Sequence, residues 1–96
     1  MAKLTPKQIR EAMTDVPAWK RKGSTIHRTY VFKDFPAAIR FVTVLAEMAE
    51  KAWHHPDIDI RWNKVTLTLT THDEGGLTRK DFELARRLDR RAGRNR

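Results

Sequence analysis

Apolar and polar residues alternate along the chain with two different periods. Between residues 37 and 52, apolar residues return every three or four positions, which predicts an amphipathic helix packed against a partner. Between residues 65 and 70, valine and leucine alternate strictly with threonine, which predicts a strand with one apolar and one polar face. Less regular forms of the same periods predict a first helix from Pro6, a hairpin over residues 18–32, a second hairpin over residues 58–70 and a last helix from Thr78 to Gly93.

Residues with known preferences for helix ends mark where the helices begin. Thr5, followed by Pro6 and then by Gln8, has the sequence of a capping box. Asp34 stands at the predicted start of the long helix, and Thr78 at the start of the last one. These signals agree with the boundaries that the periods predict.

Short turn sequences join the strands in pairs. Gly23-Ser24 and Asn63-Lys64 fit tight connections, so neighbouring strands are expected to be antiparallel. Helices with apolar stripes must bury them against the sheet, which predicts a two-layer α+β fold. We expect one domain, residues 1–96, in which a four-stranded antiparallel sheet carries three helices on one face in the order helix-hairpin-helix-hairpin-helix. Residues 94–96 are expected to form a frayed basic tail.

Composition narrows the classes of function. The net charge is +8, with many cations in the last helix and tail, but no recognised nucleic-acid motif accompanies them. We therefore expect a solvated basic face and no nucleic-acid partner. The chain has no cysteine, which excludes disulfides and thiolate chemistry. No apolar run is long enough for a bilayer and no secretory signal is visible, so the expected location is the cytoplasm, with no membrane partner.

Three of the four histidines lie in one stretch of the chain. His54 and His55 stand where Pro56 disfavours helical geometry. His72 stands at the end of the predicted strand and continues its threonine face if the strand stays regular that far. Because imidazole titrates near neutral pH, histidines at such positions favour proton transfer. We predict that these three meet in one cleft, and that His27 is structural or exposed.

A metal site is the first alternative for these histidines. Together with a carboxylate they have acceptable ligand types. Adjacent histidines normally point apart, however, and the chain has no His-x-x-x-His pattern. We therefore expect no metal in the site.

The histidines belong to a set of motifs that extends from about Leu4 to Leu88. The set comprises Glu50-Lys51-x-x-His54-His55-Pro56-Asp57, Asn63-Lys64-Val65-x-Leu67-x-Leu69-x-Thr71-His72, Gly76-Leu77-Thr78 with Asp81, and upstream Trp19 and Phe32-Lys33-Asp34-Phe35. In these residues the chain resembles the pterin-4a-carbinolamine dehydratase family. The resemblance implies a dehydratase (hydro-lyase) that removes water from 4a-hydroxytetrahydropterin, giving quinonoid dihydropterin during the recycling of tetrahydrobiopterin.

The resemblance also implies how the protein assembles and what it works with. The pterin is the substrate, and no cofactor or metal is required. Family members usually form homodimers or homotetramers, which agrees with the open edges of the predicted sheet. An aromatic amino-acid hydroxylase is the implied partner. The second alternative is a non-catalytic oligomeric binding module, a partner of a hydroxylase or a transcriptional regulator, because some animal members bind a transcription factor.

The family pattern assigns roles to individual residues. His54 and His72 are implied as general acid and base, and His55 as a third histidine of the catalytic group that mainly binds the substrate. The implied substrate-binding residues are Glu50, Pro56, Thr71, Asp73, Glu74 and Asp81. One departure is Trp53, where the family commonly has Asp or Asn; it could offer an aromatic wall instead.

Overall fold

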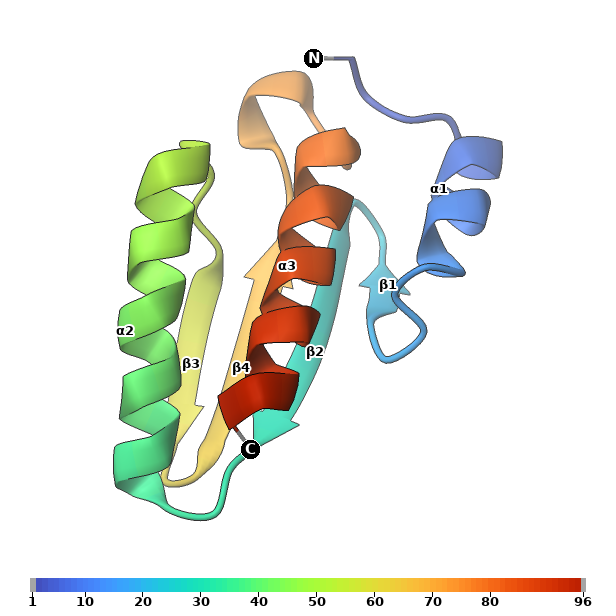
Figure 1. Ribbon diagram of the computed structural model, residues 1–96. Helices are drawn as coiled ribbons and strands as arrows, with labels where there is room; N and C mark the ends of the chain where they lie inside the picture. Colours follow the sequence, from blue (N-terminus) through green and yellow to red (C-terminus); the bar gives the residue numbers. More distant parts are fainter. Residues whose placement is uncertain (1, 96) are drawn as a thin grey trace.

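The computed structural model describes residues 2–95 and shows the elements in the predicted order, helix-hairpin-helix-hairpin-helix (Figure 1). The elements are α1 (Pro6–Met13), β1 (Lys20–Lys22), β2 (Thr25–Val31), α2 (Phe35–Ala52), β3 (Asp57–Arg61), β4 (Lys64–Leu69), the 3₁₀ turn η1 (His72–Glu74) and α3 (Arg79–Asn95). Within the described range, no helix is long and apolar enough to cross a membrane.

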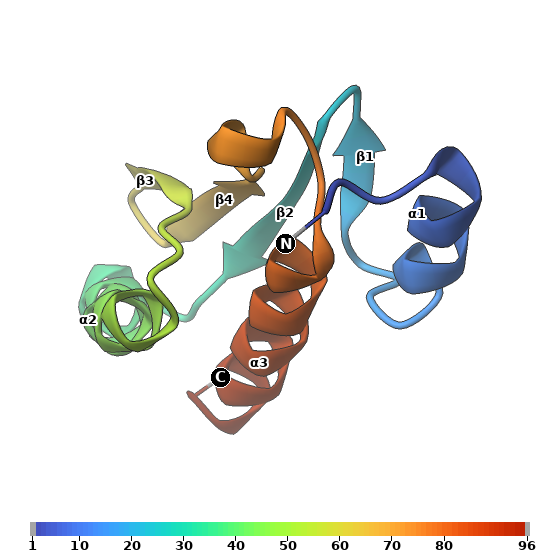
Figure 2. The same ribbon diagram turned by 90° about the horizontal axis from the view of Figure 1, so that it is seen from above.

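The strands form one antiparallel sheet in the spatial order β1-β2-β4-β3. β4 is central, with Leu67 paired to Arg28 of β2 on one side and to Ile58 of β3 on the other. α2 and α3 lie against one face of this sheet, and α1 lies beside β1 on the same side (Figure 2). The predicted α+β fold with a four-stranded antiparallel sheet and three helices is therefore confirmed.

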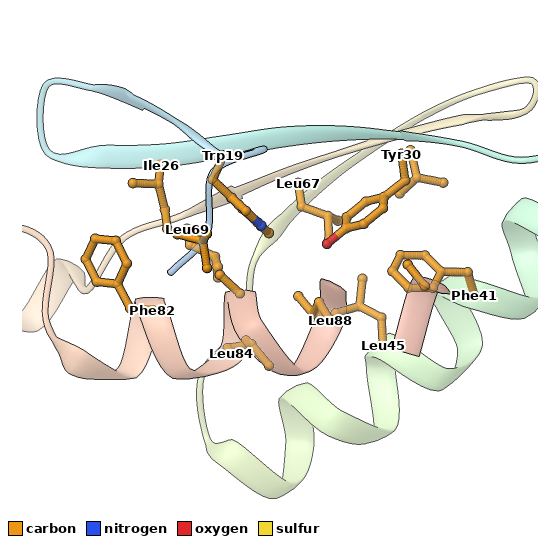
Figure 3. Close-up of a cluster of buried hydrophobic side chains, with 14 of the residues drawn as sticks. Trp19, Ile26, Tyr30, Phe41, Leu45, Leu67, Leu69, Phe82, Leu84 and Leu88 are labelled. Atoms are coloured by element: carbon orange, nitrogen blue, oxygen red, sulfur yellow. The ribbon is translucent and has the colours of Figure 1, made fainter. Parts of the chain in front are cut away.

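The core lies between the sheet and the helices α2 and α3. Ile26 and Tyr30 of β2, with Leu67 and Leu69 of β4, are fully buried on the helix-facing side (Figure 3). Val65 of β4 is also fully buried and pairs with Tyr30, so it shares that face. The helices contribute the buried side chains Phe41, Leu45, Leu84 and Leu88. β3 differs from the other long strands, because it is exposed along its whole length.

A polar network lies at the edge of this core. Asp89 of α3 accepts a hydrogen bond from the Trp19 indole N–H at 2.9 Å and another from Arg28 at 2.7 Å. The Tyr30 hydroxyl donates to the same carboxylate oxygen. Burial and the neighbouring Asp89 raise the pKa of Tyr30, so its hydroxyl keeps its proton and acts as the donor. The charge of Arg28 is thereby paired on the helix-facing side of the sheet.

Side chains close the first turns of α1 and α2 as predicted. The Gln8 N–H donates to Thr5 Oγ1 at 3.2 Å, and the Thr5 N–H donates to Gln8 Oε1 at 2.9 Å, which completes the capping box. Asp34 caps α2 by accepting the Ala37 N–H at 2.9 Å. Local side-chain chemistry therefore sets where these two helices begin.

The turn between β3 and β4 differs from its prediction by one residue. It consists of Trp62 and Asn63, so the prediction of Asn63-Lys64 is wrong. The Asn63 side-chain amide donates to Phe32 O at 2.8 Å, and the backbone carbonyl of Asn63 accepts the Phe32 N–H at 2.9 Å. These bonds hold Asn63 inside the turn, and Trp62 takes a left-handed backbone with φ 52°.

The last helix is longer than its prediction. α3 continues to Asn95, so the predicted stop at Gly93 is wrong. A glycine inside a helix costs about 1 kcal/mol relative to alanine, which is too little to end a helix anchored by its buried stripe. Of the expected frayed tail, residue 96 and the side chains of residues 94 and 95 lie outside the described part of the chain.

Candidate active site

The end of α2 sets the directions of the paired histidines. The Trp53 N–H donates to Glu50 O at 3.3 Å, and the His54 N–H donates to Ala49 O at 3.1 Å. Trp53 takes a left-handed backbone with φ 51°, so the helix closes in a Schellman motif. This reversal leaves His54 only 8% exposed and Trp53 81% exposed. Glycine usually occupies this position of the motif, so the bulky tryptophan is strained there.

Asp81, in the first turn of α3, is fully buried and holds His54. The His54 Nε2–H donates to Asp81 Oδ1 at 2.5 Å. Asp81 Oδ2 accepts the Thr71 hydroxyl and the Thr78 N–H, each at 2.9 Å. An ionised carboxylate only accepts, so it keeps His54 in the tautomer with a proton on Nε2. Within residues 2–95, Nδ1 of His54 has no hydrogen-bond partner, which leaves that nitrogen for a substrate.

His55 is held at the surface by its own helix. The His55 Nε2–H donates to Glu50 Oε2 at 2.5 Å. Both side chains are more than half exposed, so solvent screens the pair and it contributes little to stability. The pair therefore forms a polar rim whose members can exchange this contact for one to a ligand.

His72 opens η1, a tight loop that follows β4. Backbone hydrogen bonds join Thr71 and Gly76 in both directions, at 3.2 and 3.3 Å, and Gly75 supplies a left-handed residue with φ 74°. β4 itself ends at Leu69. The strand therefore does not stay regular as far as His72, and the parity argument that would place His72 on the threonine face does not apply, because side-chain alternation stops where the backbone ceases to be a strand.

A hollow of about 250 Å³ lies where these segments meet. The residues that line it are Trp53, His54, His55, Thr70, Thr71, His72, Asp73 and Lys80. The structure thus brings the three histidines to one place, as the sequence predicts. Trp53 is also part of the lining of the hollow, as expected for an aromatic wall.

The remaining predicted site residues occupy other positions. Asp81 lies behind the hollow through its bond to His54, and Glu50 borders it through its bond to His55. Pro56 and Glu74 do not line the hollow. Sequence reasoning missed the support that Thr78 gives to Asp81, although the Thr78-x-x-Asp81 spacing is a capping-box pattern and carries that signal.

The arrangement is suited to proton transfer. One imidazole is oriented by a buried carboxylate and has a free nitrogen, and a second imidazole lines the same hollow. In the described part of the chain, no group of three or more His, Asp or Glu side chains is placed to hold a metal ion.

Comparisons with known proteins point to one family. The family model described as "Pterin 4 alpha carbinolamine dehydratase" matches residues 2–91. A protein of Acidobacterium capsulatum named "Putative pterin-4-alpha-carbinolamine dehydratase" is 55% identical over 89 residues, which cover 93% of this chain and 97% of that protein. A protein of the same name from Roseiflexus sp. is 54% identical over 87 residues, covering 91% and 94%. The crystal structure of a "transcriptional coactivator/pterin dehydratase" from Brucella melitensis is 36% identical and has a TM-score of 0.91, covering 95% of this chain and 99% of that one.

Proposed function

Since this chain belongs to the pterin-4-alpha-carbinolamine dehydratase family, we propose that it removes water from a 4a-hydroxytetrahydropterin to give the quinonoid dihydropterin. The proposed source of this substrate is an aromatic amino-acid hydroxylase, whose tetrahydropterin the reaction helps to regenerate. The observation that carries the proposal is the placement of His54, oriented by Asp81, in one hollow with His55 and His72.

Dehydration requires two proton transfers. The C4a–O bond breaks as the hydroxyl gains a proton and leaves as water. The N5–H bond breaks as its proton passes to a base and its electrons form the C4a=N5 double bond. In the proposal His54 and His72 are this acid and base, because both line the hollow and imidazole is effective near neutral pH. The hollow is open to solvent, so both imidazoles return to their starting states by exchange with water.

The rim of the hollow is the proposed binding site for the ring. The amino-pyrimidine edge of a pterin presents adjacent N–H donors, and a carboxylate accepts such donors in pairs. Glu50 and Asp73 are the proposed acceptors. His55, which pairs with Glu50, is proposed to contact the ring as well. Pro56 and Glu74 are proposed to contact the substrate only at its margin.

The ultraviolet spectrum of a 4a-hydroxytetrahydropterin tests the proposed activity. We expect conversion to the quinonoid dihydropterin to be faster with the protein than in buffer, and insensitive to a chelator. A variant with both His54 and His72 replaced by alanine is the matched protein control. Equal rates with the wild-type protein and in buffer would overturn the proposal and favour a non-catalytic binding module.

Trp53→Asn is expected to increase stability and weaken substrate binding at the same time. A left-handed backbone costs a non-glycine residue about 1–2 kcal/mol, and asparagine tolerates it better than tryptophan does. The free energy of unfolding should therefore rise by about 1 kcal/mol. KM should rise by roughly ten-fold, because a ring stacked on an aromatic side chain loses about 1–3 kcal/mol when that side chain is removed. Urea denaturation and steady-state kinetics measure the two effects.

Trp62→Asn is the matched control for that prediction. Trp62 also has a left-handed backbone, with φ 52°, and is 69% exposed, but it lies at the opposite end of β4 from the hollow. It should gain similar stability with no change in KM. An equal rise in KM in both variants, or none in Trp53→Asn, would contradict the proposed wall.

We also propose that the protein is a symmetric homodimer or homotetramer joined through β3. This strand is an exposed edge, and its Ile58 and Ile60 are 41% and 38% exposed, so pairing with a second copy would cover both backbone and apolar groups. Light scattering at micromolar concentration should give a dimer or tetramer. Ile60→Lys should shift the equilibrium between oligomer and monomer toward the monomer, whereas Glu11→Lys on α1 should not. A wild-type monomer would contradict the proposal.

A further inference from the structure

A second hollow, of about 260 Å³, adjoins the first. The residues that line it come from the end of α2 and from α3: Ala52, His54, Lys80, Glu83, Leu84 and Arg87. His54 and Lys80 line both hollows, so the two hollows meet at these two side chains. The proposed proton transfers use only the first hollow, which leaves the second without a role.

Positive charge predominates in this second hollow and beyond it. Lys80 and Arg87 line it together with a single acidic residue, Glu83. The surface next to it is again hollowed and is lined by Glu83, Arg86, Arg87 and Arg90. Residues three, four and seven apart share one side of a helix, so these cations form a continuous path along α3. Such a path attracts anions toward the end of the first hollow.

Within residues 2–95, most of these cations form no ion pair. Arg86 pairs with Asp15 at 3.7 Å. In the part of the chain that the structure describes, Lys80, Arg87 and Arg90 make no ion pair. An unpaired arginine presents a planar set of N–H donors that matches a phosphate or carboxylate with two parallel hydrogen bonds. These side chains are therefore free to bind a ligand anion without breaking a contact of the fold.

We propose that the second hollow is a subsite for the side chain of the pterin, and that this side chain ends in an anion, either a phosphate monoester or a carboxylate. The inference rests on the proposed dehydratase function, because the first hollow must hold the reacting ring. Lys80 stands at the shared border and Arg87 further along, so both reach a terminal anion. Ala52 and Leu84 offer apolar contact to the carbon chain that precedes it.

Three 4a-hydroxytetrahydropterins test this subsite. They carry the same carbon side chain and end in a hydroxyl, a phosphate monoester or a carboxylate. At low salt, we expect kcat/KM to be about ten-fold higher for at least one of the anionic substrates than for the neutral one. This factor corresponds to the contribution of one hydrogen bond between charged groups. The difference should shrink as salt is added, because the cations are solvent-accessible and screened. The two anionic substrates show which anion the subsite takes.

Arg87→Gln is the diagnostic variant, and Arg40→Gln is its control. Both remove one positive charge from an exposed helical residue, but Arg40 lies near the start of α2, about 20 Å along the helix from its histidine end. Arg87→Gln should reduce the preference for the anionic substrate to about one-tenth of its wild-type value, mainly through KM. Arg40→Gln should leave that preference unchanged.

Binding of an oxidised pterin with the same anionic side chain provides a readout independent of turnover. This analogue cannot lose water, and its dissociation constant should also rise about ten-fold in Arg87→Gln. Equal kcat/KM for neutral and anionic substrates, or a preference that survives in Arg87→Gln, would overturn the subsite while the dehydratase function stands. If no substrate reacts faster than in buffer, the proposed function fails, and the subsite inference fails with it.

Discussion

His54→Ala and His72→Ala are each expected to lower kcat by about 10²- to 10⁴-fold, the usual contribution of one general acid or base. Both imidazoles line the hollow, and each transfers a proton only as the transition state forms, so the loss should fall on kcat more than on KM. The double substitution should lose more than either single one, because one imidazole can partly replace the other. Stopped-flow measurement of the absorbance change gives these rates.

Stability should separate the two histidine variants. His54→Ala removes one donor from the buried Asp81, which should lower the free energy of unfolding by about 1–3 kcal/mol. His72 is exposed, so His72→Ala should leave stability nearly unchanged. His27→Ala, the fourth histidine, is the control and should retain full kcat.

His55→Ala tests the division of roles among the three histidines. His55 is held by Glu50 at the exposed rim, and its loss should raise KM with a smaller effect on kcat. If His55→Ala instead abolishes kcat while His54→Ala only raises KM, the assigned roles are reversed, although a dehydratase would remain.

Asp89→Ala is expected to lower the free energy of unfolding by about 2–3 kcal/mol, since removing one partner of a partly buried charged pair leaves the other without compensation. The carboxylate accepts hydrogen bonds from Trp19, Arg28 and Tyr30, so three donors lose their acceptor together. The free energy of unfolding of the whole domain is expected to be only about 5–15 kcal/mol, so this loss is a large fraction of the total. Urea denaturation followed by circular dichroism measures the change.

Two further variants show whether the Asp89 network causes that loss. Asp89→Asn keeps a carbonyl acceptor but removes the charge opposite Arg28, so an intermediate loss is expected. Asp15→Ala breaks the exposed pair with Arg86, which should cost less than about 1 kcal/mol. Equal effects of Asp89→Ala and Asp15→Ala would contradict a structural role for the network.

Local patterns in the sequence predict most of the fold. The threonine alternation of β4 and the caps Thr5 and Asp34 depend on neighbouring residues, so they can be read from the sequence. The buried face of β2 could not be predicted, because Arg28 lies on it and its compensating Asp89 is 61 residues away. The β3–β4 turn was misplaced for a similar reason, since tertiary bonds to Asn63 select it.

The candidate site also combines features that the local sequence predicts with features that depend on tertiary contacts. The positions of His54 and His72 at the ends of elements predict their convergence, which needs only the order of the elements. The choice of the ring nitrogen that Asp81 holds depends on how α3 is placed against the end of α2, and no local pattern contains that information. The left-handed Trp53 is equally hidden, because the sequence rule for this position expects glycine or asparagine.

The single carboxylate of Asp81 joins the end of α2, through His54, to the loop that follows β4, through Thr71, and to the start of α3, through Thr78. Stability and activity commonly trade against each other when a functional group is poorly accommodated by its fold. Here the Asp81 carboxylate both orients the imidazole and connects segments of the fold, so stability and activity require the same side chain. A substitution of Asp81 that lowers the stability of the fold therefore also changes the orientation of the His54 imidazole. Selection for stability and selection for activity should then both retain this residue.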